Sequence, residues 1–448
     1  MSAHVVVVGG GCAGLRAAVA LADEGVRVTV LESRAGLGGR ARSFTDPATG
    51  EVVDNGQHLF LSAYDRTLAF LKRLGTADRL IFQDRLQIRF VRPDGKRFLL
   101  DCPRMPAPLH LFWGMCRLPL LTLGDRLALG RLWREVTDGK IGESRQEETV
   151  EEWLTRLGQS PAARKWFWRP LTVAVLNEEP GSVSSVGLRS VLQVLLRRPW
   201  GDARLGMACV GLSDLYAQPA RSAIESAGGE VLLNRTVTAL RVEQGVVRGV
   251  RLAGGSDLPA DAFVSALPPT ALLKILPREE RMERLVQDLR RFSMSPIISV
   301  NLWLDRPVTS EWFTALLGAR FQWIFNKGEI LKQAGIQAQY VSLIASAAYE
   351  LMGQSNEEVA RIALEELRSC FPPAREGRLI RSQVVREREA TVSLTVGTDR
   401  FRPGAETPLE NFYLAGDWTA TGLPATIESA VVSGENCARA LLKRLRIE

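Results

Sequence analysis

The stretch Val5-Val-Val-Val-Gly-Gly-Gly-Cys-Ala-Gly14 decides the fold of this 448-residue chain. Its first four residues are an apolar, β-branched run, which is typical of a buried parallel strand. Gly9, Gly11 and Gly14 then form the pattern G-x-G-x-x-G. Apolar residues recur at helical spacing after it, and a second strand is expected over Val26–Leu31. The sequence therefore predicts a strand, a tight turn, a helix and a second strand.

The three glycines have different expected tasks in binding a dinucleotide. Gly9 allows the turn, Gly11 lets the backbone approach a pyrophosphate, and Gly14 lets the helix pack closely on the strand. The first helical residues, Cys12 and Ala13, place their backbone amides at the helix N-terminus, which favours negative charge. This pattern predicts a phosphate-binding turn.

Further residues favour FAD over NAD as the dinucleotide. Glu32 ends the second predicted strand, where a carboxylate can accept hydrogen bonds from ribose hydroxyls. A second glycine turn follows and carries Arg40, whose guanidinium can lie beside the same pyrophosphate. A simple nicotinamide domain has no use for this turn. The predicted binding residues in this part of the chain are Gly9, Gly11, Cys12, Ala13, Gly14, Glu32, Ser33, Arg34, Gly38, Gly39 and Arg40.

A second candidate for flavin binding lies near the C-terminus. Residues 411–418 form a short apolar strand that ends at Gly416 and Asp417, and this carboxylate can bind ribityl hydroxyls. A helix is expected to start near Thr426 and Ile427, where N-terminal amides can stabilise negative charge on the flavin pyrimidine. We therefore expect both ends of the chain to bind one FAD.

These motifs together resemble the flavin amine oxidase and phytoene desaturase superfamily. The middle of the chain resembles it too: residues 229–237 match the strand that contacts adenine through Val237, and residues 261–269 match the return strand into the flavin domain. The resemblance implies an α/β fold. In that fold, a three-layer ββα FAD-binding domain of Rossmann-like type is expected to be interleaved with an α+β substrate domain that contains a mixed sheet.

The order of the motifs predicts how the two domains divide the chain. Alternating apolar residues over 297–304 and 321–325 predict strands of the mixed sheet, and residues 357–370 predict an amphipathic helix that covers it. The expected segments are 1–66, 205–290 and 405–448 for the FAD-binding domain, and 67–204 and 291–404 for the substrate-binding domain.

Two segments, 54–60 and 416–428, resemble the hydroxysqualene dehydroxylase family of bacterial squalene and hopanoid biosynthesis. That resemblance implies reductive removal of a hydroxyl group from hydroxysqualene, with hydride from reduced FAD and an electron donor that the sequence does not identify. In the transition state the allylic carbon that receives the hydride is cation-like, and aromatic rings in the substrate cavity would stabilise it by cation–π attraction. The candidate residues are Trp303, Phe321 and Trp323.

Three other functions stay open. A carotenoid or phytoene-type desaturase uses the same cofactor in the opposite direction. A flavin amine oxidase is disfavoured because residues 393–396 contain no flavin-linking cysteine. A non-catalytic flavoprotein would bind FAD without turnover.

His58 is the candidate catalytic residue, because it follows the second glycine turn closely enough to lie over the flavin. It is expected either to donate a proton to the leaving hydroxyl or to be a satisfied structural histidine. Asp54 precedes Asn-Gly and is expected only to organise a turn.

Residues 105–129 are apolar but contain three prolines and Arg117, so they cannot form one straight spanning helix. Flanking arginines and Trp113 predict shallow insertion into a membrane, through which a polyisoprenoid could enter; a core wall of the substrate domain is the alternative. A thinly spread net charge of +7 favours an anionic membrane over nucleic acid. We expect a cytoplasmic protein bound peripherally to the inner face of the cell membrane. With three histidines and scattered cysteines, no metal site is expected.

Overall fold

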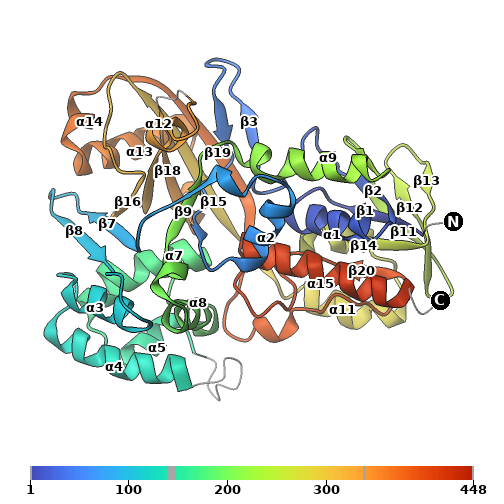
Figure 1. The fold of residues 1–448 in the computed structure, drawn as a ribbon, viewed down its shortest axis with the longest axis horizontal. Coiled ribbons are helices and arrows are strands. Elements are labelled where there is room, and N and C mark those ends of the chain that lie inside the picture. The colour runs from blue at the N-terminus through green and yellow to red at the C-terminus, as the bar shows by residue number, and fades with distance from the viewer. Residues whose placement is uncertain (1–2, 139–147, 337–339, 446–448) are drawn as a thin grey trace.

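The computed structural model describes residues 3–138, 148–336 and 340–445, and it contains two main sheets that lie side by side (Figure 1). The predicted domain segments also include residues 1–2, 139–147, 337–339 and 446–448, which lie outside the described residues.

The first sheet is parallel throughout and has the strand order β10-β2-β1-β14-β20. The valine run of β1 pairs on one side with β2 and on the other with β14, so Val6 lies between Thr29 and Phe263. Both N-terminal strands agree with the sequence prediction to within one residue. The five strands are β1 (His4–Val8), β2 (Arg27–Leu31), β10 (Glu230–Leu232), β14 (Ala262–Ser265) and β20 (Phe412–Leu414).

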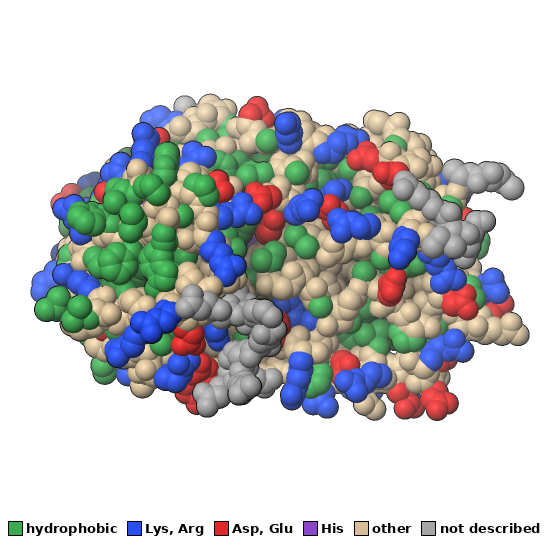
Figure 2. Space-filling model, turned by 60° about the horizontal axis from the view of Figure 1, so that its bottom comes forward, with side chains coloured by type: hydrophobic (Ala, Val, Ile, Leu, Met, Phe, Trp, Pro, Cys, Tyr) green, Lys and Arg blue, Asp and Glu red, His purple; other side chains and the backbone are tan. Residues whose placement is uncertain are grey.

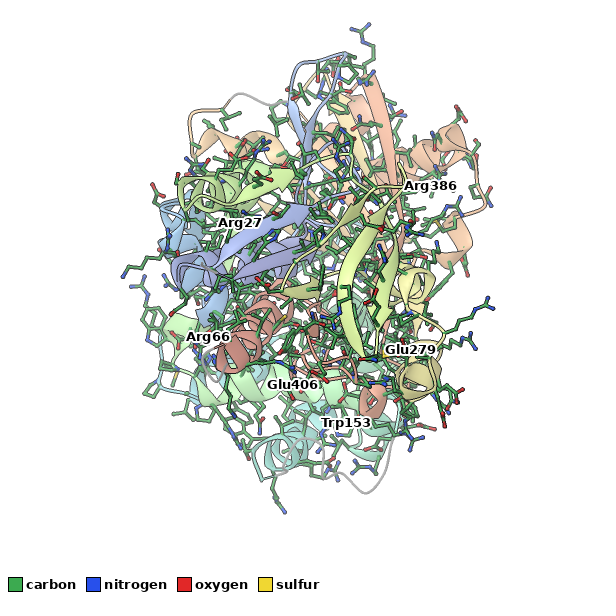
Figure 3. All side chains as sticks on the ribbon, turned by 90° about the vertical axis from the view of Figure 1, so that its right-hand side faces the viewer. Arg27, Arg66, Trp153, Glu279, Arg386 and Glu406 are labelled. Carbon is green, nitrogen blue, oxygen red and sulfur yellow. The ribbon has the colours of Figure 1, made fainter. Side chains whose placement is uncertain are left out.

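Alternate residues of β1 face two different layers. Val5 and Val7 pack in the apolar cluster of the helices, whereas Val6 and Val8 pack against a three-stranded antiparallel sheet. This is the expected three-layer ββα arrangement, and Figure 3 views it from the end of the molecule where Arg27 lies. The outer layers are the helices α1 (Cys12–Asp23), α9 (Gln218–Ser226) and α15 (Ile427–Leu445), and the strands β11 (Val237–Glu243), β12 (Val246–Leu252) and β13 (Asp257–Leu258).

The second sheet is mixed, as expected, with the order β19-β15-β18-β17-β16-β7-β8; only β16 and β7 pair in parallel. One predicted strand, over 297–304, starts earlier because Ser293 already pairs with Ser393 of β19. The strands are β7 (Gln87–Val91), β8 (Arg97–Asp101), β15 (Ser293–Leu304), β16 (Phe313–Leu316), β17 (Trp323–Asn326), β18 (Tyr340–Ser346) and β19 (Leu379–Ser393).

Helices cover both faces of the mixed sheet (Figure 1). The predicted amphipathic helix is confirmed as α13, which packs Val359, Ala363 and Leu367 onto one face. A helical layer that contains Trp153 covers the other face. The helices are α13 (Asn356–Cys370) and α14 (Pro372–Glu376) on the first face, and α3 (Leu109–Arg117), α4 (Leu123–Asp138), α5 (Val150–Arg156), α7 (Arg169–Leu176) and α8 (Ser185–Arg197) on the second.

Strands of the two sheets alternate along the chain, which is the interleaving that the motif order implies. A small third sheet, β5-β9-β6, crosses the predicted border at residue 66, since it joins β5 (Phe60–Leu61) and β9 (Leu205–Ala208) to β6 (Leu80–Phe82). The domain boundaries themselves stay a prediction.

Candidate flavin site

The first part of the site is the turn that enters α1. Gly11 precedes the helix in an extended conformation, and no side chain caps the first-turn amides. Gly38 joins this turn from the second glycine motif, donating its N–H to the Gly10 carbonyl at 2.8 Å. A Cβ atom placed on Gly11 would meet only the Cα of Gly39, at 3.9 Å. The turn therefore leaves an open surface beside uncapped amides, which suits a pyrophosphate.

Two predicted helix residues flank this surface. Ala13 is buried in the helix cluster, and Cys12 is half-buried at the first helical position. Burial, followed by the charges of Glu428 and Asp417, raises the pKa of the Cys12 thiol to about 12. The residue is therefore a neutral thiol at the helix N-terminus, available for packing and not for nucleophilic chemistry.

Glu32 lies at the end of β2 and is buried. Its Oε2 accepts the N–H of Gly10 at 2.9 Å, and its Oε1 accepts the N–H of Arg34 at 2.9 Å and the hydroxyl of Ser33 at 3.2 Å. One carboxylate thus ties the phosphate turn to the loop after β2. Val237, the predicted adenine contact, lies in the same apolar cluster as Leu31.

The second part of the site is an ion pair that joins the two predicted motifs. Arg40 Nη2 lies 2.6 Å from Asp417 Oδ1, and Arg40 Nη1 donates to the carbonyl of Ala390 at 2.9 Å. Burial opposes the charge on Arg40, but the charge of Asp417 and its hydrogen bond raise the pKa of the guanidinium. Residues 377 positions apart in sequence are therefore brought together.

The start of α15 is built as predicted. Thr426 accepts the N–H of Ser429 through its Oγ1 at 3.2 Å, and Ile427 is the first residue of the helix. One turn later, Ser433 Oγ accepts the N–H of Gly416 at 2.9 Å. The helix thus fixes the turn that carries Asp417.

Sequence reasoning missed Arg402, which is almost fully buried. Its guanidinium donates to the carbonyls of Asp417 at 3.0 Å, Trp418 at 3.3 Å and Leu423 at 2.8 Å. Arg402 therefore holds the backbone of the C-terminal loop in place. Its guanidinium also pairs with Asp399 at 3.0 Å, but the carbonyl groups that it holds follow 15 to 21 residues later, so no local motif marks this role.

His58 is half-buried in the loop after β4 (Val52–Asp54). Burial lowers the pKa of its imidazole below the ordinary value; Asp54 and a hydrogen bond to the Arg40 backbone oppose this, whereas the charges of Arg40 and Lys327 add to it. The loop thus brings His58 next to Arg40, and the ring is neutral at neutral pH. Its catalytic role stays a prediction.

The expectation for Asp54 is wrong. The residue is not in a turn: it ends β4, is buried, and forms an ion pair with the buried Lys327 at 2.9 Å. Its Oδ1 also accepts the hydroxyl of Ser43 at 2.7 Å and the N–H of Leu212 at 3.1 Å. The partner lies 273 residues away, so sequence spacing could not reveal it.

The three aromatic candidates do not line one cavity. Trp303 packs against Tyr340 with their ring centroids 4.9 Å apart, under the β3–β4 hairpin, where β3 is Ser43–Thr45. Phe321 packs on the α13 side of the mixed sheet, and Trp323 packs on the other side. Only Trp323 lies in the same apolar cluster as α3 and α4.

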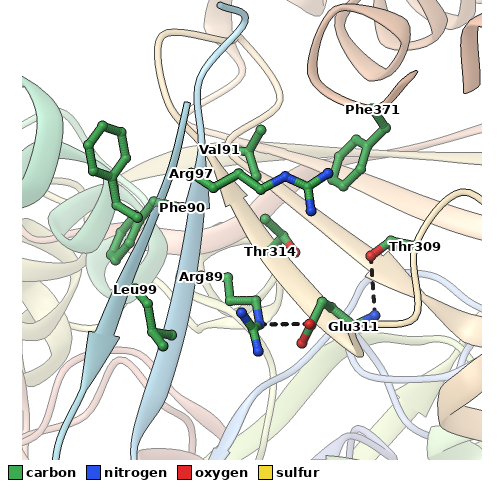
Figure 4. A pocket seen from close by; sticks show the side chains of 10 residues that line it. Arg89, Phe90, Val91, Arg97, Leu99, Thr309, Glu311, Thr314 and Phe371 are labelled. Carbon is green, nitrogen blue, oxygen red and sulfur yellow. Dashed lines mark hydrogen bonds and ion pairs between the residues drawn. The ribbon is translucent and has the colours of Figure 1, made fainter. Parts of the chain in front are cut away.

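A cavity of about 260 Å³ lies elsewhere, over β7, β8 and β16 (Figure 4). Arg89 and Glu311 form an ion pair in its wall at 2.7 Å, and Phe90 and Phe371 give it apolar sides. None of the predicted flavin residues lines this cavity, so it is separate from the site described above.

The residues present fit a flavin dinucleotide. An open surface beside uncapped amides, a buried carboxylate at the end of β2, and an arginine–aspartate pair that joins both motifs are the features that FAD requires.

The profile of the flavin-containing amine oxidoreductase family matches residues 12–442, so the chain belongs to that family and is an FAD-dependent oxidoreductase. It is 31% identical to hydroxysqualene dehydroxylase of Rhodopseudomonas palustris, with 99% of each chain covered. It is 28% identical to the 15-cis-phytoene desaturase of an Oncidium hybrid, over 98% of this chain and 78% of that one. Among solved structures, an oxidoreductase from Methanosarcina mazei has the same fold, with a TM-score of 0.75 at 16% identity over 98% and 100% of the two chains.

Proposed function

We propose that this chain reductively dehydroxylates hydroxysqualene to squalene in bacterial squalene and hopanoid biosynthesis. The observation that carries the proposal is the end-to-end match to hydroxysqualene dehydroxylase, at 31% identity over 99% of both chains. The motif segments 54–60 and 416–428 support it, since Asn55 of the first and Asp417 of the second both contact Arg40.

When bound, reduced FAD supplies the hydride that replaces the hydroxyl group. The chain's proposed contribution is to bind and orient. The α1 turn and Glu32 bind the nucleotide half, and the Arg40–Asp417 pair and the α15 N-terminus bind the flavin half. Charge balance also requires one proton, so that the hydroxyl leaves as water. We propose that His58 delivers this proton as its imidazolium form, after taking up a proton from solvent, and returns to the neutral imidazole.

A route for the apolar substrate is supported by α3 and α4. Leu109, Trp113, Leu123 and Leu127 are exposed on these helices, and Figure 2 shows hydrophobic side chains gathered on this side of the molecule next to basic ones. The guanidinium of Arg117 lies 6.0 Å from the Trp113 ring. Because such an apolar patch with an arginine rim suits an anionic bilayer surface, we propose peripheral membrane contact here.

The same segment also forms part of the core, which was the alternative interpretation of residues 105–129. Leu111 and Met115 of α3 and Leu129 of α4 face inwards and line an apolar crevice against α8. We propose that the polyisoprenoid enters from the membrane at the exposed patch; the crevice itself has a volume of only about 10 Å³ and is too small to hold it. Among the described helices, none combines the length and apolar character needed to cross a bilayer.

A desaturase is the second candidate, because a 15-cis-phytoene desaturase also matches over 98% of this chain. The two functions differ in the direction of hydride transfer: a dehydroxylase takes hydride from reduced flavin, whereas a desaturase gives hydride to oxidised flavin. The test is to reduce the FAD-loaded protein with dithionite under anaerobic conditions, add hydroxysqualene in detergent, and follow flavin reoxidation with assay of squalene. Stoichiometric squalene supports the proposal. No reoxidation, together with reduction of the oxidised flavin by phytoene or squalene, refutes it in favour of the desaturase.

A further inference from the structure

Lys327 is the first residue of α12 (Lys327–Lys332), and its side chain is only 2% exposed. Its Nζ lies 2.9 Å from Oδ2 of Asp54, whose side chain is 4% exposed. Two charges buried in this way are costly to desolvate, and removing one partner leaves an uncompensated charge. A pair of this kind links two segments firmly, whatever its net contribution to stability.

The segment fixed by this pair leads directly into the flavin site. Asn55 follows Asp54; its Nδ2 donates to the Arg40 carbonyl at 2.9 Å, and its Oδ1 accepts the Arg42 N–H at 2.9 Å. Ser299 of β15 donates to the Asn55 carbonyl at 3.3 Å. Polar contacts therefore run without interruption from α12, through Asp54 and Asn55, to the backbone of the arginine that pairs with Asp417.

We propose that Lys327 is a positioning residue of the flavin site: through Asp54 it fixes the loop 55–58 and, through Asn55, the backbone that carries Arg40. The inference depends on FAD binding and not on the identity of the substrate. It also assigns α12, which follows a strand of the mixed sheet, a part in building the flavin pocket.

The chain offers a matched control on the same hairpin. Asp46, at the other end of the β3–β4 hairpin, has a fully buried side chain that pairs with Arg381 of β19 at 2.6 Å. This pair also links the hairpin to the mixed sheet, but it does not adjoin loop 55–58. Asp46→Asn therefore tests whether loosening the hairpin alone affects the flavin.

The experiment measures FAD affinity by equilibrium dialysis in four variants: Lys327→Met, Asp54→Asn, the double variant of both, and Asp46→Asn. We expect the first three to bind FAD at least about tenfold more weakly than the parent, since ordering of the loop is lost. We expect Asp46→Asn to bind within about twofold of the parent. Lys327→Arg, which keeps the charge, should recover part of the affinity.

A second measurement is the pKa of His58, followed by NMR of the three histidine rings, with the His58 signal assigned through His58→Gln. A variant that merely destabilises the fold would not shift this pKa in the pattern given below. Asp54, Arg40 and Lys327 are the charged groups that act on this ring. Lys327→Met leaves a carboxylate near it and should raise the pKa of His58. Asp54→Asn leaves an ammonium group and should lower it, and the double variant should restore it.

Two results would overturn the inference. One is parental FAD affinity in the double variant, which stays folded because no unpaired charge is buried in it. The other is an equal loss of affinity in Asp46→Asn. If Lys327→Met does not fold, the double variant and Asp54→Asn still decide the question. If the FAD affinities and the His58 pKa change as expected but the parent protein forms no squalene, only the proposed substrate is refuted.

Discussion

Replacing Leu123 and Leu127 by serine tests the membrane contact most directly. The two residues are 72% and 76% exposed, so about three-quarters of each side chain is free to transfer into the interface of a bilayer. Full burial of a leucine is worth roughly 2 kcal/mol, so the two together should contribute about 3 kcal/mol. The double variant should therefore bind vesicles about 100-fold more weakly.

The assay is co-sedimentation with vesicles that contain anionic lipid, with conversion of vesicle-embedded hydroxysqualene measured in parallel. Conversion from vesicles should fall with binding, whereas conversion of detergent-dissolved substrate should stay at the parental rate. Ile380→Ser is the matched control, because Ile380 is 59% exposed on β19, outside the α3–α4 patch. Parental sedimentation of the double variant, or an equal loss in the control, would refute the membrane contact.

Three further predictions concern the flavin site and its support. Asp417→Asn removes the ion pair with Arg40 and should weaken FAD binding by about 30-fold or more, measured by equilibrium dialysis, since the remaining half-buried cation loses its partner. Gly434→Ala should lower the melting temperature by several degrees, because its Cβ would lie 2.4 Å from the Ala13 carbonyl; Gly254→Ala, with no atom within 4 Å, should not. His58 has a lowered pKa in the folded state, so below about pH 6.5 the unfolded chain binds the extra proton and stability falls as the pH falls. Denaturant unfolding at pH 7 and pH 5 should therefore show a smaller loss for His58→Gln than for the parent, and equal losses would contradict this account.

The parts of the fold that the sequence predicts well are those with local signals. The valine run, the glycine turn and the acidic end of β2 lie within the first 32 residues, and each constrains its neighbours sterically. The amphipathic period of α13 is equally local. Strand limits are less predictable, because Ser293 joins β15 only through its partner Ser393, 100 positions away.

The residues that sequence reasoning missed depend on contacts between distant segments. Lys327 looks like an ordinary surface lysine until the fold buries it against Asp54, and an Asp before Asn-Gly is normally read as a turn residue. Arg402 has no sequence signal either, since it donates to three backbone carbonyl groups and every residue carries such a group. Of the aromatic candidates, the sheet separates Phe321 from Trp323 because they pack on opposite faces.

The contact between α1 and α15 has a consequence for biogenesis. Residues 9–14 leave the ribosome more than 400 residues before α15 does, which at roughly 5–20 residues per second corresponds to about 20–80 s. Throughout that interval the nascent chain lacks Asp417, β20 and the helix that packs on Ala13 and Ala17. The complete flavin site therefore forms only after synthesis of the C-terminal helix, and until then the face of α1 that packs on α15 is uncovered.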